Sequence, residues 1–125
     1  MSEGEIKRLG KIRLKSGEEA TAYVIREGDR ATLFVPTDEE FPDASRKSVV
    51  EGEFDGTTFR VHRLDTGSRF EKQGFARSLL GAIASGLGAD EIIALNPNED
   101  ARRKKFYENI GFSPVGRDMV WKRRR

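Results

Sequence analysis

The stretch KQGFAR, residues 72–77, is followed at once by apolar residues that recur at helical spacing. From Phe75 to Leu87 these residues fall three or four positions apart, which predicts a helix with one buried face. Gly86 and Gly88 come at the end of the pattern and are typical of a helix terminus. A helix that begins at a tight glycine turn presents unpaired amides, which can bind a phosphate group. The same turn could instead only open a core helix, so the pattern leaves both alternatives open.

The chain before this turn has the character of β-structure. Short runs rich in Ile, Leu, Val, Tyr and Thr are separated by glycine-containing turns. Residues 36–45 hold two prolines and four acidic residues, which predicts a loop or a short helical turn. Asp55-Gly56 joins the last two runs and favours a β-hairpin. We therefore expect strands near the following residues: 5–15, 19–27, 30–35, 47–54 and 57–65.

The chain after the predicted helix changes pattern twice more. Residues 91–96, EIIALN, are nearly all apolar, which is typical of a strand covered on both faces. Residues 99–110 return to helical spacing before Gly111, and residues 113–123 could form a final strand or pair of strands. A helix between two strands within 58–95 favours a right-handed crossover between parallel strands.

The composition excludes several classes of protein. A chain of 125 residues, 36 % hydrophobic and 35 % charged, suits one globular domain. The absence of cysteine excludes disulfides, thiolate metal sites and a cysteine nucleophile, and it fits a cytoplasmic location. The single histidine, His62, excludes a histidine-rich metal centre. No apolar run approaches the ~18 residues of a membrane span, and the first residues lack a signal-peptide core.

The charge is distributed unevenly along the chain. Residues 1–100 hold 14 Lys/Arg and 19 Asp/Glu, whereas residues 101–125 hold nine Lys/Arg and two Asp/Glu. This asymmetry indicates an anionic ligand or partner near the C-terminal end. The alternative is a solvated helix face at 102–105, RRKK, followed by a mobile basic tail at 122–125.

Two short motifs lie on either side of the predicted helix and strand. Residues 70–76, FEKQGFA, are similar to a turn of the pattern Arg/Gln-x-x-Gly-x-Gly/Ala. Residues 106–112, FYENIGF, are similar to an aromatic segment of the pattern Phe/Tyr-Tyr-x-x-x-Gly-Phe. Both motifs, with their spacing, resemble the GNAT superfamily of N-acetyltransferases, and the resemblance covers about residues 58–121. It implies an α/β (α+β) fold with a GNAT-like mixed sheet, an N-terminal antiparallel meander, a strand–turn–helix phosphate site and a second C-terminal helix.

The resemblance also implies a domain plan and a function. We expect a single domain over 1–125, with a β-rich part at 1–57, an acyl-CoA-binding part at 58–121 and the basic tail at 122–125. The implied reaction transfers an acetyl group from acetyl-CoA to an amine of a small molecule or protein, without a metal. Acetyl-CoA and an amine acceptor are then the partners; nucleic acid is possible through the basic C-terminal region but not favoured.

Specific residues fall at the functional positions of the family. The turn would hold the coenzyme A pyrophosphate, and a backbone amide near the end of the preceding strand would polarise the thioester carbonyl. Tyr107 falls at the position of the general acid toward the leaving thiolate, or else it only packs. Arg102 could contact the 3′-phosphate of coenzyme A, and Lys105 could share its helix face. The implied cofactor-binding residues are Leu64, Asp65, Thr66, Lys72, Gln73, Gly74, Phe75, Ala76, Arg77 and Arg102.

The general base is less defined. His62 has a suitable intrinsic pKa and lies on the strand expected to border the cleft, although a lone strand histidine is more often a surface residue. Glu51, Glu53 and Asp65 are alternatives, and a bound water could also relay the proton.

The sequence departs from the family at several positions. Glu71 stands where the family usually has Arg or Gln, Asp100 where it often has Asn, and Arg103 where it often has Ala. The N-terminal half lacks the pattern of the family's first two helices, which normally build much of the acceptor site. The missing helices and Glu71 motivate an alternative, a non-catalytic GNAT-like module that binds a protein or nucleic acid. A third alternative is a structural or assembly protein that pairs through its β-rich half.

Overall fold

The computed structural model describes residues 5–97 and 101–124. Within them lie eight strands, one 3₁₀ turn and two α-helices. The strands are β1 (Ile6–Arg13), β2 (Glu19–Glu27), β3 (Arg30–Pro36), β4 (Arg46–Phe54), β5 (Thr58–Thr66), β6 (Glu91–Ala94), β7 (Ser113–Val115) and β8 (Asp118–Lys122). The helical elements are η1 (Ser68–Phe70), α1 (Phe75–Ser85) and α2 (Ala101–Asn109). The predicted start of the second helix, at residues 99 and 100, lies outside the described residues.

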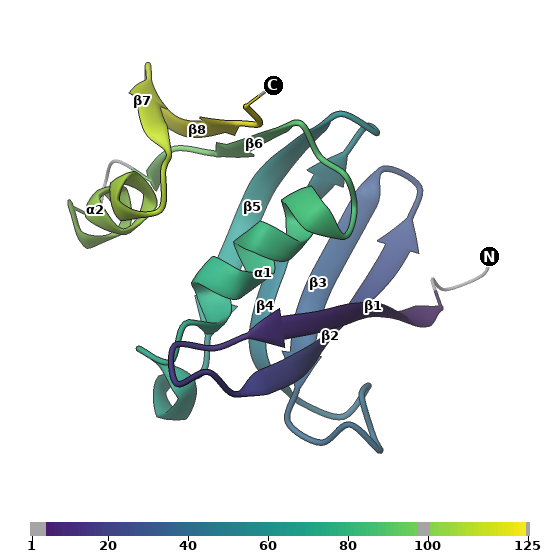
Figure 1. Cartoon of the computed structure of the whole chain (residues 1–125). Helices are drawn as coiled ribbons and strands as arrows, with labels where there is room; N and C mark the ends of the chain where they lie inside the picture. Colours follow the sequence, from purple (N-terminus) through teal and green to yellow (C-terminus); the bar gives the residue numbers. More distant parts are fainter. Residues whose placement is uncertain (1–4, 98–100, 125) are drawn as a thin grey trace.

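All eight strands belong to one open sheet, in the order β1-β2-β3-β4-β5-β6-β8-β7. Strands β1 to β5 form the expected antiparallel meander. Strands β5 and β6 are parallel and are connected through α1, which confirms the predicted strand–helix–strand unit. Figure 1 shows α1 lying across the middle of the sheet and α2 at the opposite end of the molecule from β1. The mixed α/β class expected from the sequence is confirmed.

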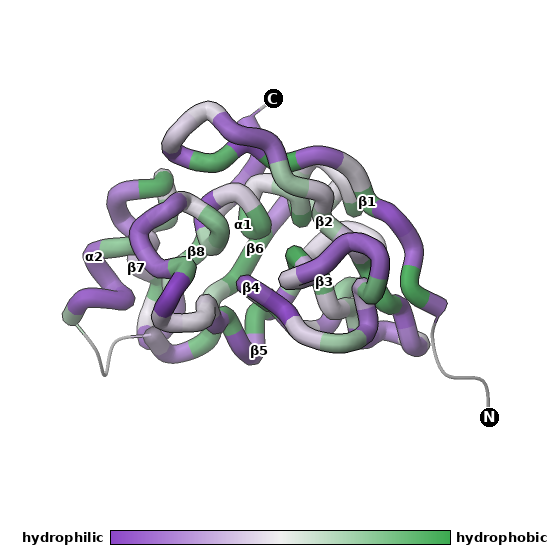
Figure 2. Tube along the Cα trace, turned by 90° about the horizontal axis from the view of Figure 1, so that it is seen from below, coloured by the Kyte–Doolittle hydropathy of each residue, from purple (hydrophilic) through white to green (hydrophobic). Residues whose placement is uncertain are grey.

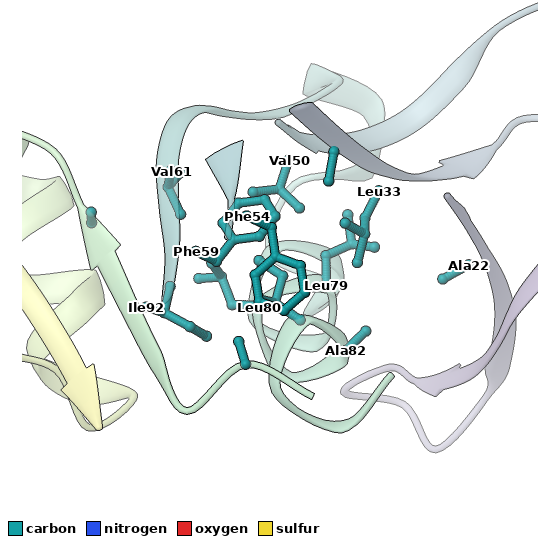
Figure 3. Close-up of a cluster of buried hydrophobic side chains, with 14 of the residues drawn as sticks. Ala22, Leu33, Val50, Phe54, Phe59, Val61, Leu79, Leu80, Ala82 and Ile92 are labelled. Carbon is teal, nitrogen blue, oxygen red and sulfur yellow. The ribbon is translucent and has the colours of Figure 1, made fainter. Parts of the chain in front are cut away.

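The main core lies between α1 and the sheet. Helix α1 contacts β1, β3, β4, β5 and β6, and it buries Phe75, Leu79, Leu80, Ala82 and Ile83. Leu79 and Ile83, four positions apart on one helix face, are fully buried. Figure 3 shows Leu79 and Leu80 facing the strand residues that complete this core, which include Leu33, Val50, Phe54, Phe59 and Ile92. The helical spacing in the sequence therefore reflects burial against the sheet.

Helix α2 differs from α1 in both position and polarity. It contacts β7 and β8, and of its described residues only Tyr107 is buried. Figure 2 shows α2 as a mainly hydrophilic segment on the far side of the molecule from β1 and β3. The RRKK face is accordingly exposed, as a solvated helix face would be.

A β-bulge at His62 interrupts the pairing of β4 with β5. Glu51 pairs with Arg63 and Gly52 pairs with Val61, so His62 is the extra residue. A Cβ atom on Gly52 would collide with the backbone carbonyl of Arg60. Glycine at this position therefore allows the two strands to approach at the bulge.

The C-terminal residues are partly built into the fold. Lys122 ends β8, and the Arg123 guanidinium donates hydrogen bonds to the carbonyls of Ala84, at 2.6 Å, and Ala89, at 3.0 Å. Its Nε also lies 3.2 Å from the Asp90 carboxylate. The alternative of a mobile tail is therefore wrong for Lys122 and Arg123, because strand pairing and the end of α1 hold them. Arg125 lies outside the described residues.

Candidate functional site

The sheet opens between β5 and β6. Val61 and Ala94 form the last paired position of these strands, and the Leu95 amide donates to the Val61 carbonyl at 3.4 Å. Asn96 then adopts a left-handed conformation, with φ of 46°, and its amide donates to the Asp118 carboxylate at 2.9 Å. Because the chain turns away here while β5 continues, one backbone edge of residues 62–66 borders the opening instead of a strand.

A cavity of about 730 Å³ occupies this opening. It is lined by β5, by the turn before α1, by the end of β6 and by α2. Among its lining residues are these predicted site residues: His62, Leu64, Asp65, Thr66, Lys72, Ala76, Arg102 and Tyr107. Residues far apart in the sequence are thus brought to one cleft.

A second cavity, of about 750 Å³, surrounds the start of α1. It contains the predicted residues Thr66, Lys72, Gly74, Phe75, Ala76 and Arg77. Thr66, Glu71, Lys72, Ala76 and Phe106 line both cavities, so the two meet at the turn. Gln73 lines neither; its side-chain amide donates to the Arg69 carbonyl at 3.4 Å.

The turn has the backbone geometry of an open helix start. Gly74 is left-handed, with φ of 92°, and no side chain caps the helix. The Ser78 amide donates to the Gly74 carbonyl at 3.0 Å, so the amides of residues 75–77 precede the first intrahelical bond. Phe75 is only 2 % exposed and directs its ring into the core. Residues 75–77 all line the second cavity, and Ala76 also lines the first, so these amides stand beside the cavities at the positive end of the helix dipole.

The loop between β1 and β2 packs against this turn, which the sequence analysis did not predict. The Lys15 amide donates to the Gln73 carbonyl at 2.9 Å, and the Ser78 hydroxyl donates to the Arg13 carbonyl. A Cβ on Gly74 would lie 3.1 Å from the Lys15 nitrogen. No local pattern in the sequence reports this contact, because its two sides are almost sixty residues apart.

Tyr107 lies in the wall of the first cavity. Its side chain is 5 % exposed and its ring lies 5.2 Å from that of Phe106 and 5.1 Å from that of Phe112. Burial raises the pKa of Tyr107 to about 12, against a smaller lowering effect of the Arg103 charge. The phenol therefore keeps its proton at neutral pH.

His62 lies on the bulge at the cleft, with its side chain about half exposed. Its Nε2 atom is 3.4 Å from the Glu53 carboxylate on the neighbouring strand. Glu51 instead lies opposite Arg63. Of the two glutamates considered as bases, Glu53 is therefore the one placed beside His62.

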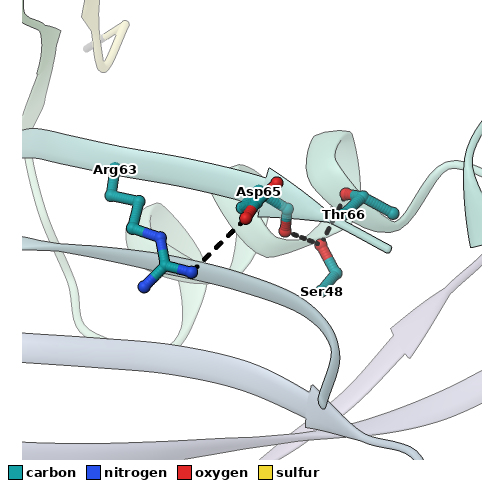
Figure 4. Close-up of polar contacts among 4 residues, drawn as sticks. All are labelled: Ser48, Arg63, Asp65 and Thr66. Atoms are coloured by element: carbon teal, nitrogen blue, oxygen red, sulfur yellow. Dashed lines mark hydrogen bonds and ion pairs between the residues drawn. The ribbon is translucent and has the colours of Figure 1, made fainter. Parts of the chain in front are cut away.

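Ser48 fixes the end of β5. It is fully buried, and its hydroxyl oxygen lies 3.1 Å from the Asp65 carbonyl and 2.8 Å from the Thr66 hydroxyl (Figure 4). The Asp65 carboxylate pairs with Arg63 at 3.3 Å. Ser48 was not among the predicted site residues, although a serine beside the apolar pair Val49-Val50 was a visible signal.

Solved structures provide an independent comparison of this architecture. A protein from Desulfovibrio desulfuricans assigned to the GNAT acetyltransferases matches 75 % of this chain and 69 % of its own, with a TM-score of 0.57 and 16 % identity. Nourseothricin acetyltransferase matches 94 % of this chain and 85 % of its own, with a TM-score of 0.57 and 15 % identity. The chain has a GNAT fold.

A third matching structure was solved with a bound ligand. The PaiA N-acetyltransferase from Thermoplasma acidophilum, solved in complex with coenzyme A, matches 78 % of this chain and 62 % of its own. Its TM-score is 0.53 and its identity is 15 %. No protein-family model matches the chain, and no curated protein matches its sequence.

This GNAT fold lacks one feature that the resemblance implied for the family. Residues 5–74 contain no α-helix, and their one helical element is the 3₁₀ turn η1. Strand β2 connects to β3 through a tight turn at Gly28 and Asp29, as the glycine-containing turn signal predicted. The absence of two early helices, expected from the sequence, therefore holds for the described residues.

The unusual residues of the GNAT motifs lie at the site. Glu71 is exposed and lines both cavities, and Arg103 lines the first. Arg102 lines the first cavity as well, whereas Asp100 lies outside the described residues. Among residues 5–97 and 101–124, no group of three His, Cys, Asp or Glu side chains could hold a metal ion. No helix in the same residues has the length and apolar character needed to cross a membrane.

Proposed function

We propose that this chain is an acyl-CoA-dependent N-acetyltransferase. The observation that carries the proposal is the opening between β5 and β6 directly beside an uncapped helix start. A free strand edge thus faces the first cavity, and a set of free amides faces the adjoining second cavity. The strand edge suits the acyl end of an acyl-CoA, and the amides suit its pyrophosphate. The GNAT fold supports the same conclusion.

The turn would bind the pyrophosphate. The amides of Gly74, Phe75 and Ala76 would donate to its oxygens, and Lys72 and Arg77 would add positive charge. The acyl arm would lie in the first cavity, where the backbone of residues 64–66 would polarise the thioester carbonyl. Ser48 would keep that backbone in place through its bonds to Asp65 and Thr66.

The transfer would proceed by direct attack of the acceptor amine. The amine nitrogen, belonging to a small molecule or a protein, bonds to the carbonyl carbon, and the carbon–sulfur bond breaks. Tyr107, whose phenol is protonated at neutral pH, would donate a proton to the leaving thiolate. The attacking nitrogen would lose one proton as the amide forms, and this proton would pass to His62 or to water.

Calorimetric titration with acetyl-CoA tests the proposal. Wild type should bind the cofactor. Gly74→Glu should weaken binding, because it adds a negative charge at the turn and distorts a backbone with φ of 92° whose Cβ would lie 3.1 Å from the Lys15 nitrogen. Gly81→Glu is the matched control: Gly81 lies on the exposed side of the same helix, where an added Cβ meets nothing within 4 Å. Absence of wild-type binding at millimolar cofactor would contradict the proposal.

The second candidate function is a non-catalytic module that binds a protein or nucleic acid. It is favoured by the absence of an α-helix in residues 5–74 and by the exposed RRKK face of α2. Nucleic-acid binding would appear as a salt-dependent gel shift. Because Arg123 holds the end of α1, the test should replace residues 102–105 and Arg124, and leave Arg123 in place. An unchanged shift in that variant would contradict a role for these cations.

A further inference from the structure

The second cavity has a wall that no sequence motif indicated. Arg13, Leu14 and Lys15, from the end of β1 and the loop after it, line this cavity opposite α2. Arg13 and Lys15 are exposed, so their charged groups are free to meet a ligand. Both belong to the N-terminal half of the chain, outside the segment that resembles the GNAT motifs.

The loop is held on the turn by backbone contacts. Its Lys15 amide bonds to the Gln73 carbonyl, and the Arg13 carbonyl accepts the Ser78 hydroxyl. A third hydrogen bond, from the Leu14 amide to the Glu18 carbonyl at 2.8 Å, closes the loop itself. The backbone that carries the two cations is therefore fixed relative to the start of α1, and only the side chains need to be ordered by a ligand.

The cavity combines positive charge with apolar walls. Among the described residues, its cations are Arg13, Lys15, Lys72 and Arg77, and Glu71 is its one carboxylate residue. Its apolar lining includes Phe70, Phe106 and Ile110. A ligand that suits both features carries a planar, weakly polar ring and more than one phosphate group, as a phosphorylated adenosine does.

We propose that Arg13 and Lys15 bind the 3′-phosphate on the ribose of coenzyme A and so select the 3′-phosphorylated cofactor. This inference rests on the proposed function, which places the pyrophosphate at the turn. Lys72 and Arg77, on the turn itself, serve that pyrophosphate. Arg102, the cation that the sequence analysis assigned to the 3′-phosphate, lines the first cavity, at the acyl end of the site. The β1–β2 loop thus supplies the charge at the nucleotide end.

Paired titrations with coenzyme A and dephospho-coenzyme A, which lacks the 3′-phosphate, test this inference. Wild type should bind coenzyme A at least about tenfold more tightly, as expected for charge-assisted hydrogen bonds. In Arg13→Ala/Lys15→Ala this ratio should fall toward one, through weaker binding of coenzyme A and unchanged binding of dephospho-coenzyme A. Lys11→Ala, an exposed lysine of the same strand outside the cavity lining, is the control and should keep the wild-type ratio.

The outcomes separate this inference from the proposed function. If neither cofactor binds to wild type, the proposed function and this inference both fail. If both bind and the double variant keeps the wild-type ratio, the assignment of Arg13 and Lys15 is overturned while the proposed function stands. Equal affinity of wild type for the two cofactors also overturns it. Circular dichroism checks the fold, and Lys15→Gln, which keeps the aliphatic stem, replaces the double variant if that unfolds.

Discussion

The two helices border the same cleft but are held there in different ways. Helix α1 buries five side chains against the sheet, and Arg123 donates a hydrogen bond to the Ala84 carbonyl near its end. Helix α2 buries only Tyr107 among its described residues and contacts β7 and β8. The comparison indicates that α1 is a fixed support whose free amides can serve a ligand, whereas α2 brings one buried phenol to the site. Each of the following predictions tests one side of this difference.

The largest expected effect is on the core of α1. Leu79→Ala should lower the free energy of unfolding by about 2–5 kcal/mol, because Leu79 is fully buried and its removal leaves a cavity. Ile110→Ala, after α2, should cost less because Ile110 is only partly buried. Urea unfolding measures both. Equal losses would contradict the difference between the two helices.

A pH-dependent effect is expected from Tyr107 on α2. Its folded pKa of about 12 lies above the ordinary value of 10, so the folded state keeps a proton that the unfolded state releases. Stability should therefore fall as pH rises from 10 to 12, by up to about 2–3 kcal/mol. Tyr107→Phe should remove this part of the loss.

Tyr107→Phe also separates structure from catalysis. The variant should retain acetyl-CoA binding, because the turn and not the phenol would hold the cofactor. It should transfer acetyl groups about 10²–10⁴-fold more slowly, the range typical of a lost general acid. Urea unfolding at several pH values, titration and a thiol-release assay provide the three measurements. A wild-type transfer rate in this variant would contradict the proposed role of Tyr107 as the general acid.

Loss of the Arg123 contacts near the end of α1 should have a smaller effect on stability. Arg123→Ala should cost about 1–2 kcal/mol, since it removes hydrogen bonds to two carbonyls and a partly exposed ion pair with Asp90. Lys122→Ala is the control, because its pair with Glu91 spans 3.8 Å and its side chain is mostly exposed. Thermal or urea unfolding compares the two. A larger loss of stability in Lys122→Ala than in Arg123→Ala would contradict this role of Arg123.

The smallest expected effect concerns the carboxylate at the start of α1. Glu71→Gln should raise the affinity for coenzyme A about two- to fivefold, because it removes a negative charge that faces both cavities. The gain should shrink at high salt. Glu40→Gln, on an exposed loop outside these cavities, should change nothing. Weaker binding in the Glu71 variant would mean that this carboxylate contributes to the site.

Much of the fold was predictable from local pattern. Helix α1 begins at Phe75, as the apolar spacing predicts, and β5 lies within one residue of the predicted strand. These elements could be predicted because their buried residues recur at a fixed spacing along the sequence. The first strand was predicted to reach residue 15 but ends at Arg13, because residues 14–18 form the turn that packs on α1. The single-domain plan stays a prediction.

The candidate site was only partly predictable. The turn and Tyr107 could be predicted as site residues because their motifs are short and continuous; both lie at the cavities, and their roles stay predictions. Ser48, the Glu53–His62 pair and the Arg13–Lys15 wall were not recognised, since each depends on pairing between distant strands or loops. Which cations share a cavity is likewise a property of the folded chain.

By itself, the sequence determined where the helices and strands form, the absence of thiol chemistry and the presence of a helix that begins at an open glycine turn. Local periodicity and backbone preference are properties of neighbouring residues, so these features need no tertiary information. Only the tertiary structure decided that β5 and β6 separate beyond Val61, that Arg123 belongs to the end of α1 and that the first hairpin borders the turn. Those arrangements arise when segments far apart in the chain pack together, and local pattern does not encode them.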